Sequence, residues 1–159
     1  MGDTFDGPLP YVEMLVSSYG KTFCYVPFDA GHHCYGHCQH THALTLAQGD
    51  YIHANDDDDV WTHNARDVMQ RAVDVDPEKP HLFRFRSQFG TIFWDQQGIV
   101  QRHHIGGHCL VAPNIDGKVG KWECAYAGDF DMIRSTLDLH GGDESAVWHD
   151  ELIAIARPG

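Results

Sequence analysis

Four consecutive aspartates, Asp56 to Asp59, constrain the fold of this chain more than any other feature. They close a strand-like run, 49–55, and open a helix-like run, 61–65. Adjacent carboxylates repel one another at neutral pH, so a fold that presents them together is expected to hold a cation there. In open α/β sheets ligands collect beyond the carboxyl ends of the strands, which is where this junction would lie. The sequence therefore predicts a hard-metal site that serves a phosphorylated ligand.

The length and charge of the chain limit its class. Its 159 residues suffice for one compact domain, so 1–159 is expected to be a single unit. With 11 Lys and Arg against 23 Asp and Glu, the formal net charge of -12 argues against nucleic acid as a partner. The first residues lack the features of a signal peptide, and no apolar run approaches the roughly 20 residues that cross a bilayer. We expect a cytoplasmic, soluble protein without a transmembrane segment.

Hydrophobic periodicity predicts where the helices lie. Apolar residues at helical spacing mark the segments 11–19, 43–47, 65–73 and 130–137. Thr62 is placed to cap the third of these helices, and Pro77 stops it.

Strand-like runs are more frequent in the second half of the chain. They are 22–26, 51–54, 81–86, 91–94 and 109–112. A last apolar run, 152–156, fits either a final strand or a helical tail. Strands that alternate with helices early and cluster later predict an α/β fold with a mixed sheet and flanking helices.

The residues around the aspartate run resemble the signature of a known family. Ala-Gln-Gly-Asp-Tyr-Ile at 47–52, followed by Asp56 to Asp59, is similar to the "A-x-G-[DE]-Y-I … D-x-D-D" pattern of the family-two-like glycosyltransferases of GT-A fold. Further segments fit in the expected order: Asp6-Gly7-Pro8 at a turn, Pro113-Asn114 at a strand end, and 128–131 at the acceptor-side "E-D" motif. The resemblance covers nearly the whole chain and implies a GT-A-like, Rossmann-like mixed sheet.

The chain departs from this family at three places. It starts at the end of the family's second strand, so we expect an N-terminally truncated domain that lacks the strand, helix and strand of the nucleotide-base pocket. His40-Thr41 stands where the family carries Arg-Asn, and Gly128 stands where it carries Glu. The expected product is therefore either an incomplete enzyme or a shortened relative that binds without turnover.

The resemblance also implies roles for the aspartates. In the resembled enzymes the D-x-D carboxylates hold Mg²⁺ or Mn²⁺ against the diphosphate of a nucleotide-sugar, which stabilises the departing diphosphate. The matching positions are Asp56 and Asp58, with Asp58 the first choice for direct ligation. Asp57 and His37 are expected near the donor, together with Asp56. The alternative is a solvated acidic loop, or a helix N-terminus at which Asp59 only caps the next helix.

Asp129 matches the acceptor-side motif and is implied as the general base. It would take a proton from the acceptor hydroxyl, of a glycan or a small molecule, in a reaction that inverts the anomeric configuration. The implied activity is metal-dependent transfer of a sugar from a nucleoside diphosphate donor. The alternative is that Asp129 caps the helix of 130–137.

Two further interpretations stay open. One is a non-catalytic metal- or nucleotide-binding remnant of the fold, completed by a partner chain or by homo-oligomerisation. The other is a zinc module on the His- and Cys-rich run 32–42, where Cys34 and Cys38 would share a helical face although their spacing matches no common zinc pattern. Other candidate zinc ligands are His37, His42, His103, His104, His108 and Cys109, and further candidate metal ligands are His140 and His149.

Two residue types remain to be placed. The five cysteines, odd in number and irregularly spaced, are expected to be reduced thiols. Three tryptophans, Trp94, Trp122 and Trp148, are expected to lie in the core rather than to stack on a sugar ring.

Overall fold

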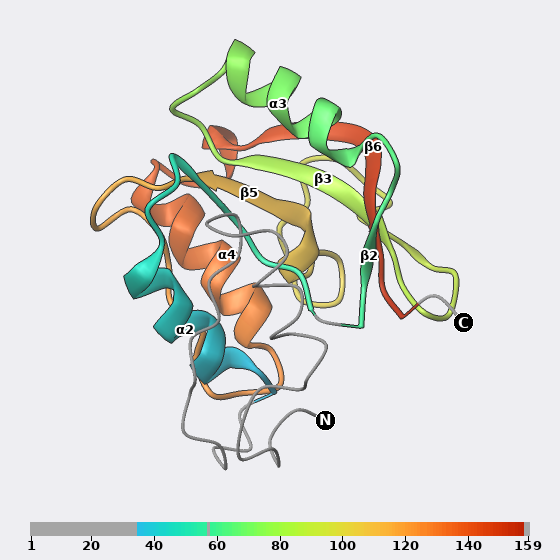
Figure 1. Cartoon of the computed structure of the whole chain (residues 1–159), viewed down its shortest axis with the longest axis horizontal. Coiled ribbons are helices and arrows are strands. Elements are labelled where there is room, and N and C mark those ends of the chain that lie inside the picture. Colours follow the sequence, from blue (N-terminus) through green and yellow to red (C-terminus); the bar gives the residue numbers. More distant parts are fainter. Residues whose placement is uncertain (1–34, 57, 158–159) are drawn as a thin grey trace, which may run out of the picture.

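The computed structural model describes residues 35–56 and 58–157, which form an α/β fold around one mixed sheet (Figure 1). Its strands are β1 (Tyr51–His53), β2 (Val60–Trp61), β3 (His81–Arg86), β4 (Ile92–Phe93), β5 (Leu110–Pro113) and β6 (Val147–Ile155). They follow the order β1-β5-β3-β6-β2, and β4 pairs with β3. Strand β3 runs parallel to β6, and every other pairing is antiparallel. The expected α/β class with a mixed sheet is confirmed at this level.

The central strand β3 is covered on both faces. Leu82 and Phe83 are fully buried although they are neighbours, and successive side chains of a strand point to opposite faces. Strands β2 and β1 stand at opposite ends of the strand order, yet Trp61 of β2 lies close to His53 of β1, with ring centroids 5.8 Å apart. The sheet is therefore strongly curled.

Helices lie on both sides of the sheet. They are α2 (His37–Leu46), α3 (Ala65–Val75) and α4 (Gly128–Leu139), with short 3-10 turns at η2 (Gly107–Cys109) and η3 (Asp143–Ser145). Helix α3 covers the β3 and β6 side, and α4 lies on the other side with α2 next to it (Figure 1). None of the helices in the described ranges is long and apolar enough to span a membrane.

The periodic segments formed the predicted elements. Helix α3 buries Ala65, Val68, Ala72 and Val73 on one face, as expected, and ends one residue before Asp76, which precedes Pro77. The runs 81–86 and 91–94 became the hairpin of β3 and β4, whose turn uses Gly90 at a φ of 83°. Helix α4 contains the predicted face of 130–137.

Other boundaries differ from the expectations. Helix α2 starts at His37, earlier than the predicted 43–47, and Ala47 already has extended geometry. Thr62 does not cap α3, because its hydroxyl donates to the Leu152 carbonyl of β6 at 2.9 Å and Asn64 takes the cap position. The run 152–156 belongs to a strand, not to a helical tail. The predicted segments 11–19 and 22–26 lie outside the described residues.

The cysteine and tryptophan expectations are partly met. Cys38 and Cys109 are reduced, whereas Cys124 is disulfide-bonded, so the expectation of reduced thiols is wrong for that residue. Trp94 and Trp122 are buried in the core, and Trp148 packs against it.

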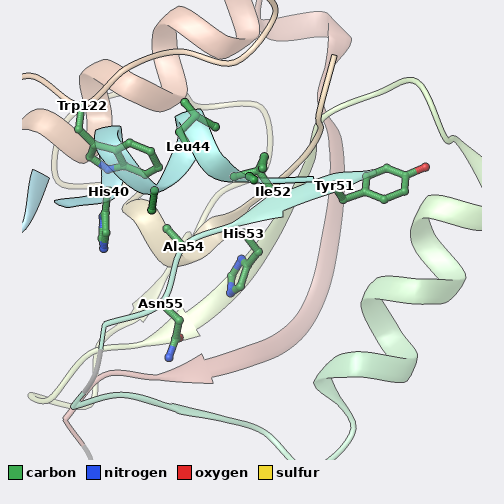
Figure 2. A pocket seen from close by; sticks show the side chains of 10 residues that line it. His40, Leu44, Tyr51, Ile52, His53, Ala54, Asn55 and Trp122 are labelled. Carbon is green, nitrogen blue, oxygen red and sulfur yellow. The ribbon is translucent and has the colours of Figure 1, made fainter. Parts of the chain in front are cut away.

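A cavity of about 360 Å³ lies between α2 and β1 (Figure 2). Its lining includes Leu44 and Ala47 from the helix and Ile52 and His53 from the strand. Within the described part of the chain, β1 ends the strand order, which leaves this side of the strand to face the cavity.

The buried His81 and the half-buried His149 form a hydrogen-bonded pair. The His81 Nε2 donates to the Asp76 carbonyl at 3.0 Å, so Nδ1 of the neutral ring is an acceptor for the His149 Nε2 at 2.9 Å. His149 stacks on Phe83 with ring centroids 4.4 Å apart. Burial lowers the pKa of both histidines, because the charged imidazolium is poorly solvated there. His149 therefore packs against buried rings, and within the described ranges it belongs to no group of three potential metal ligands.

This pair predicts a fall in stability between pH 7.5 and 5.5. The unfolded chain takes up protons near the ordinary histidine pKa of about 6.5, while His81 and His149 stay neutral in the fold to lower pH. The folded state then binds fewer protons, so its free energy of unfolding decreases as the pH drops through this window. Urea titrations at the two pH values measure the decrease. It should be smaller in His149→Phe and unchanged in the exposed-site control His63→Asn, and equal decreases in both variants would contradict the assignment.

Candidate metal centre

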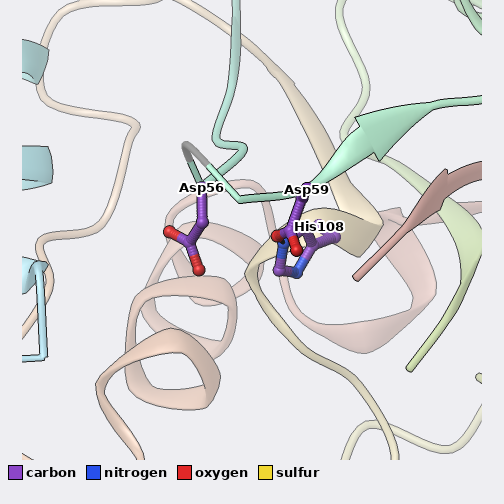
Figure 3. Close-up of side chains that lie close together, drawn as sticks. All are labelled: Asp56, Asp59 and His108. Atoms are coloured by element: carbon purple, nitrogen blue, oxygen red, sulfur yellow. Dashed lines mark hydrogen bonds and ion pairs between the residues drawn. The ribbon is translucent and has the colours of Figure 1, made fainter. Parts of the chain in front are cut away.

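Three metal-ligand side chains converge beyond the end of β1 (Figure 3). One ligand atom from each of Asp56, Asp59 and His108 lies within 4.8 Å of the others. The aspartates belong to the loop between β1 and β2, and His108 belongs to η2, directly before β5. In the described ranges this is the one group of three or more His, Cys, Asp or Glu side chains with such spacing, and we call it the Asp-Asp-His group.

Asp59 is the buried member of this group. Its side chain is only 2% exposed, one carboxylate oxygen contacts the His108 Nε2, and the other accepts the backbone N–H of Arg157 at 2.8 Å. Two donors therefore fix the carboxylate in place. The interpretation of Asp59 as a helix cap is wrong, because the cap position of α3 is Asn64.

Asp56 is the exposed member, with 45% of its side chain accessible. Partial burial raises its pKa, and Asp59 and Asp129 act in the same direction, whereas His108 and His40 oppose them. The His40 Nε2 lies 3.6 Å from Asp56 Oδ1. A carboxylate in this setting gains free energy when a cation binds to it.

Asp58 is not part of the group. The Asp58 carboxylate forms an ion pair with Arg157 Nε at 2.8 Å, in an exposed position. Asp57 lies outside the described residues. Of the four aspartates, the structure brings together the first and the fourth, so the first-choice ligand of the sequence, Asp58, is turned away from His108 toward Arg157.

Asp129 lies in the first turn of α4 and is held by an aromatic donor. The Trp122 Nε1–H donates to Asp129 Oδ1 at 2.9 Å, and the His37 Nε2 lies 3.6 Å from the same oxygen. The cap residue of α4 is Ala127, without a side-chain cap hydrogen bond. Asp129 therefore does not cap the helix. Its second carboxylate oxygen, Oδ2, takes part in neither the contact with Trp122 nor that with His37.

Asp129 also adjoins the Asp-Asp-His group. A Cβ on Gly107 would lie 3.0 Å from Asp129 Oδ1, so the carboxylate packs directly against the backbone that precedes His108. Asp129 also raises the pKa of Asp56, because the two carboxylates are close enough to repel each other. The carboxylates of Asp56, Asp59 and Asp129 thus surround one region of the surface.

His37 is buried between Asp129 and the loop before α4. Only 5% of the residue is exposed, and its Nδ1 lies 2.9 Å from the Glu123 carbonyl, to which it donates. Because the neutral ring carries its proton on Nδ1, Nε2 faces the Asp129 carboxylate without donating to it. His37 therefore packs against Asp129, whereas the resemblance implies a place beside the donor phosphates.

The position of His37 explains why residue 128 is glycine. A Cβ at this position would lie 2.6 Å from His37 Cε1 and closer still to Nδ1 and to the Glu123 carbonyl. The Glu that the resembled family carries has no room here while His37 keeps its place.

Gly128→Ala is therefore expected to destabilise the fold by about 1–3 kcal/mol, the usual cost of overpacking. Urea unfolding measures the change, with Gly49→Ala as a matched control, since a Cβ there makes only an ordinary contact of 3.6 Å. Equal stability of both variants would show that His37 moves aside without cost.

The His- and Cys-rich run does not assemble a zinc site within the described part of the chain. Cys109 is fully buried, and burial raises the pKa of its thiol to about 12, which keeps it protonated. His104 is bound to Asp95 and to the Gln96 carbonyl instead. Cys34 lies outside the described residues, so the zinc interpretation is untested for it.

Sequence reasoning missed two members of this region. His108 was considered only as a zinc ligand, because nothing local links it to an aspartate 49 residues away. Arg157 gave no signal either, although it contacts both Asp58 and Asp59. Both contacts depend on how the sheet curls.

No protein-family model matches this chain, and no curated protein matches its sequence.

Proposed function

We propose that this chain is a metal-dependent glycosyltransferase domain that moves a sugar from a nucleoside diphosphate donor to a hydroxyl acceptor. The observation that carries the proposal is the convergence of Asp56, Asp59 and His108 next to Asp129. A divalent cation and a separate carboxylate base, side by side, are the two parts that such a transfer requires. The resemblance of 47–59 to the D-x-D signature supplies the substrate class.

Within this proposal Mn²⁺ is the preferred ion. Two carboxylates and one imidazole fit a transition metal better than Mg²⁺, which favours oxygen ligands in near-ideal octahedral geometry. The ligands are Asp56, Asp59 and His108, so the D-x-D pair of the resemblance is replaced by the first and last aspartates of the run. When bound, the ion would neutralise charge on a diphosphate leaving group.

Asp129 has the role of general base. The Trp122 N–H holds Oδ1, so Oδ2 is free to accept the proton of an attacking hydroxyl. Attack from the side opposite the leaving group would invert the anomeric centre. Trp122 acts on this step through Asp129 and is a positioning residue.

The GT-A fold is part of the same proposal. An α/β architecture with a mixed sheet, and an acidic group beyond the carboxyl end of β1, is compatible with it.

Calorimetric titration with UDP and with GDP, each with and without Mn²⁺, tests the proposal. We expect binding of at least one nucleotide in the presence of Mn²⁺ and a loss of this binding when the ion is removed. Nucleotide binding that does not depend on Mn²⁺ would count against the transferase, and so would the absence of nucleotide binding. Release of UDP or GDP from the corresponding nucleotide-sugar then reports turnover, which Asp129→Asn should abolish.

A non-catalytic remnant is the second candidate, favoured by one observation. Gly128 stands where the resembled family has a Glu, and His37 fills the space. Mn²⁺-dependent nucleotide binding without any turnover, in the same titrations, would support this candidate over the enzyme. Metal analysis of protein purified without added metal separates both from a zinc module, which would retain stoichiometric zinc.

A further inference from the structure

The cavity between α2 and β1 carries three buried polar atoms without a hydrogen-bond partner. They are His40 Nδ1, His53 Nε2 and Asn55 Oδ1. All three residues line the same cavity, and Figure 2 shows their polar ends on one side of it, away from Leu44 and Ile52. Buried polar groups are nearly always paired in folded proteins, so three on one cavity require an explanation.

The contacts of these residues determine what each free atom can do. The His53 Nδ1 donates to the Leu110 carbonyl at 3.0 Å, so Nε2 of the neutral ring is an acceptor. The Asn55 Nδ2 donates to the Asp56 carbonyl at 3.2 Å, which fixes the amide and leaves Oδ1 as an acceptor. The His40 Nε2 faces the Asp56 carboxylate, which favours a proton on Nε2 and an acceptor at Nδ1.

The rest of the wall is apolar. It consists of small and aliphatic side chains with one indole: Ala43, Leu44, Ala47, Ile52, Ala54 and Trp122. A volume of about 360 Å³ is at the small end of the range for ligand pockets. A suitable ligand is thus one small ring with an apolar face and several donors.

We propose that this cavity binds a neutral cyclic polyol, of the monosaccharide or cyclitol class, whose hydroxyl groups donate to His53, Asn55 and His40. The C–H face of such a ring lies against the aliphatic wall. The site is distinct from the Asp-Asp-His group, because none of its three acceptors belongs to that group. It requires neither a metal ion nor transferase activity.

The test uses protein labelled with ¹⁵N at histidine, in buffer with a metal chelator. The probes are glucose, galactose, mannose and myo-inositol at millimolar concentrations. Ethylamine is the control, as a small cation that donates hydrogen bonds but is not a polyol. Long-range ¹H–¹⁵N spectra report on the two nitrogens of His53. We expect at least one polyol to shift the Nε2 resonance of His53 saturably, and we expect Nδ1 to remain protonated throughout.

Variants make the test specific to the cavity. Asn55→Leu removes one acceptor at nearly constant shape and should weaken polyol binding at least about tenfold, the effect of losing one buried hydrogen bond. Gln97→Leu, at an exposed site away from the cavity, should leave it unchanged. His53→Phe, followed by saturation-transfer signals of the polyol, provides a second removal of an acceptor.

Three results would overturn the proposal: no polyol shifts His53, ethylamine shifts it and the polyols do not, or both variants bind the polyols as the wild type does. Failure of the transferase proposal is separately visible, because the nucleotide titrations depend on Mn²⁺ and this test excludes metal.

Discussion

Asp56→Asn is expected to lower the Mn²⁺ affinity at least about 100-fold, while the metal-free fold becomes no less stable. Both effects arise from one carboxylate. Asp56 supplies one of the three ligand atoms of the Asp-Asp-His group, and its charge is the one that partial burial and two neighbouring aspartates disfavour. Removing that charge costs the ion a ligand but relieves repulsion in its absence.

The sign of the stability effect follows from the direction of the pKa shift. A raised pKa means that the charged form of the carboxyl group carries a larger free-energy penalty in the folded state than in the unfolded state. Asparagine has no such penalty, so the free energy of unfolding should stay equal or increase. Calorimetric titration with MnCl₂ and urea unfolding in chelator measure the two quantities.

Asp58→Asn is the matched control for both measurements. Asp58 is two positions away, more than half exposed, and paired with Arg157 rather than with His108. We expect its replacement to change Mn²⁺ affinity by no more than a few-fold. The reverse ranking, with binding lost in Asp58→Asn and kept in Asp56→Asn, would show that the D-x-D alignment identifies the ligands better than the geometry does.

The sequence was most informative where structure depends on local pattern. The apolar face of α3 follows directly from a period of 3.6 residues, and the strand-like run 81–86 formed β3. Gly90 marked the turn between β3 and β4 because few other residues adopt a positive φ. The α/β class followed from the order of these elements.

Long-range contacts were not predictable in the same way. The start of α2 was missed because His37 to His42 has no apolar periodicity; this end of the helix is anchored by His37 on the Glu123 carbonyl and by Thr41 on that of Trp122. Thr62 has the right type and spacing for a cap, yet the Leu152 carbonyl of β6 takes its hydroxyl. Each of these outcomes depends on a partner more than 80 residues away.

The candidate metal centre shows the same division. An acidic group beyond β1 was predictable, since four aspartates follow a strand. Which of them face the same point was not, because the loop turns Asp58 toward Arg157 and Asp59 toward His108. A run of identical residues contains no information about which side chains point inward.

Asp59→Ala is expected to lower the free energy of unfolding by about 1–3 kcal/mol, the usual cost of leaving a buried hydrogen-bond donor without its acceptor. The Asp59 carboxylate is 2% exposed and accepts from both His108 and the backbone N–H of Arg157. Alanine would leave both donors without this acceptor in a site that water barely reaches. Urea unfolding in chelator isolates this structural effect from any contribution of a bound ion.

The same measurement on Asp58→Ala provides the comparison, since an exposed ion pair contributes only about 0–1 kcal/mol. The aspartate run therefore divides into three roles: Asp59 stabilises the loop, Asp56 is destabilising until a cation binds, and Asp58 is nearly neutral. If Asp59→Ala proved no more harmful than Asp58→Ala, the buried contact with His108 would not hold the loop in place. The Asp-Asp-His group would then lack the rigid member on which its affinity for a metal ion depends.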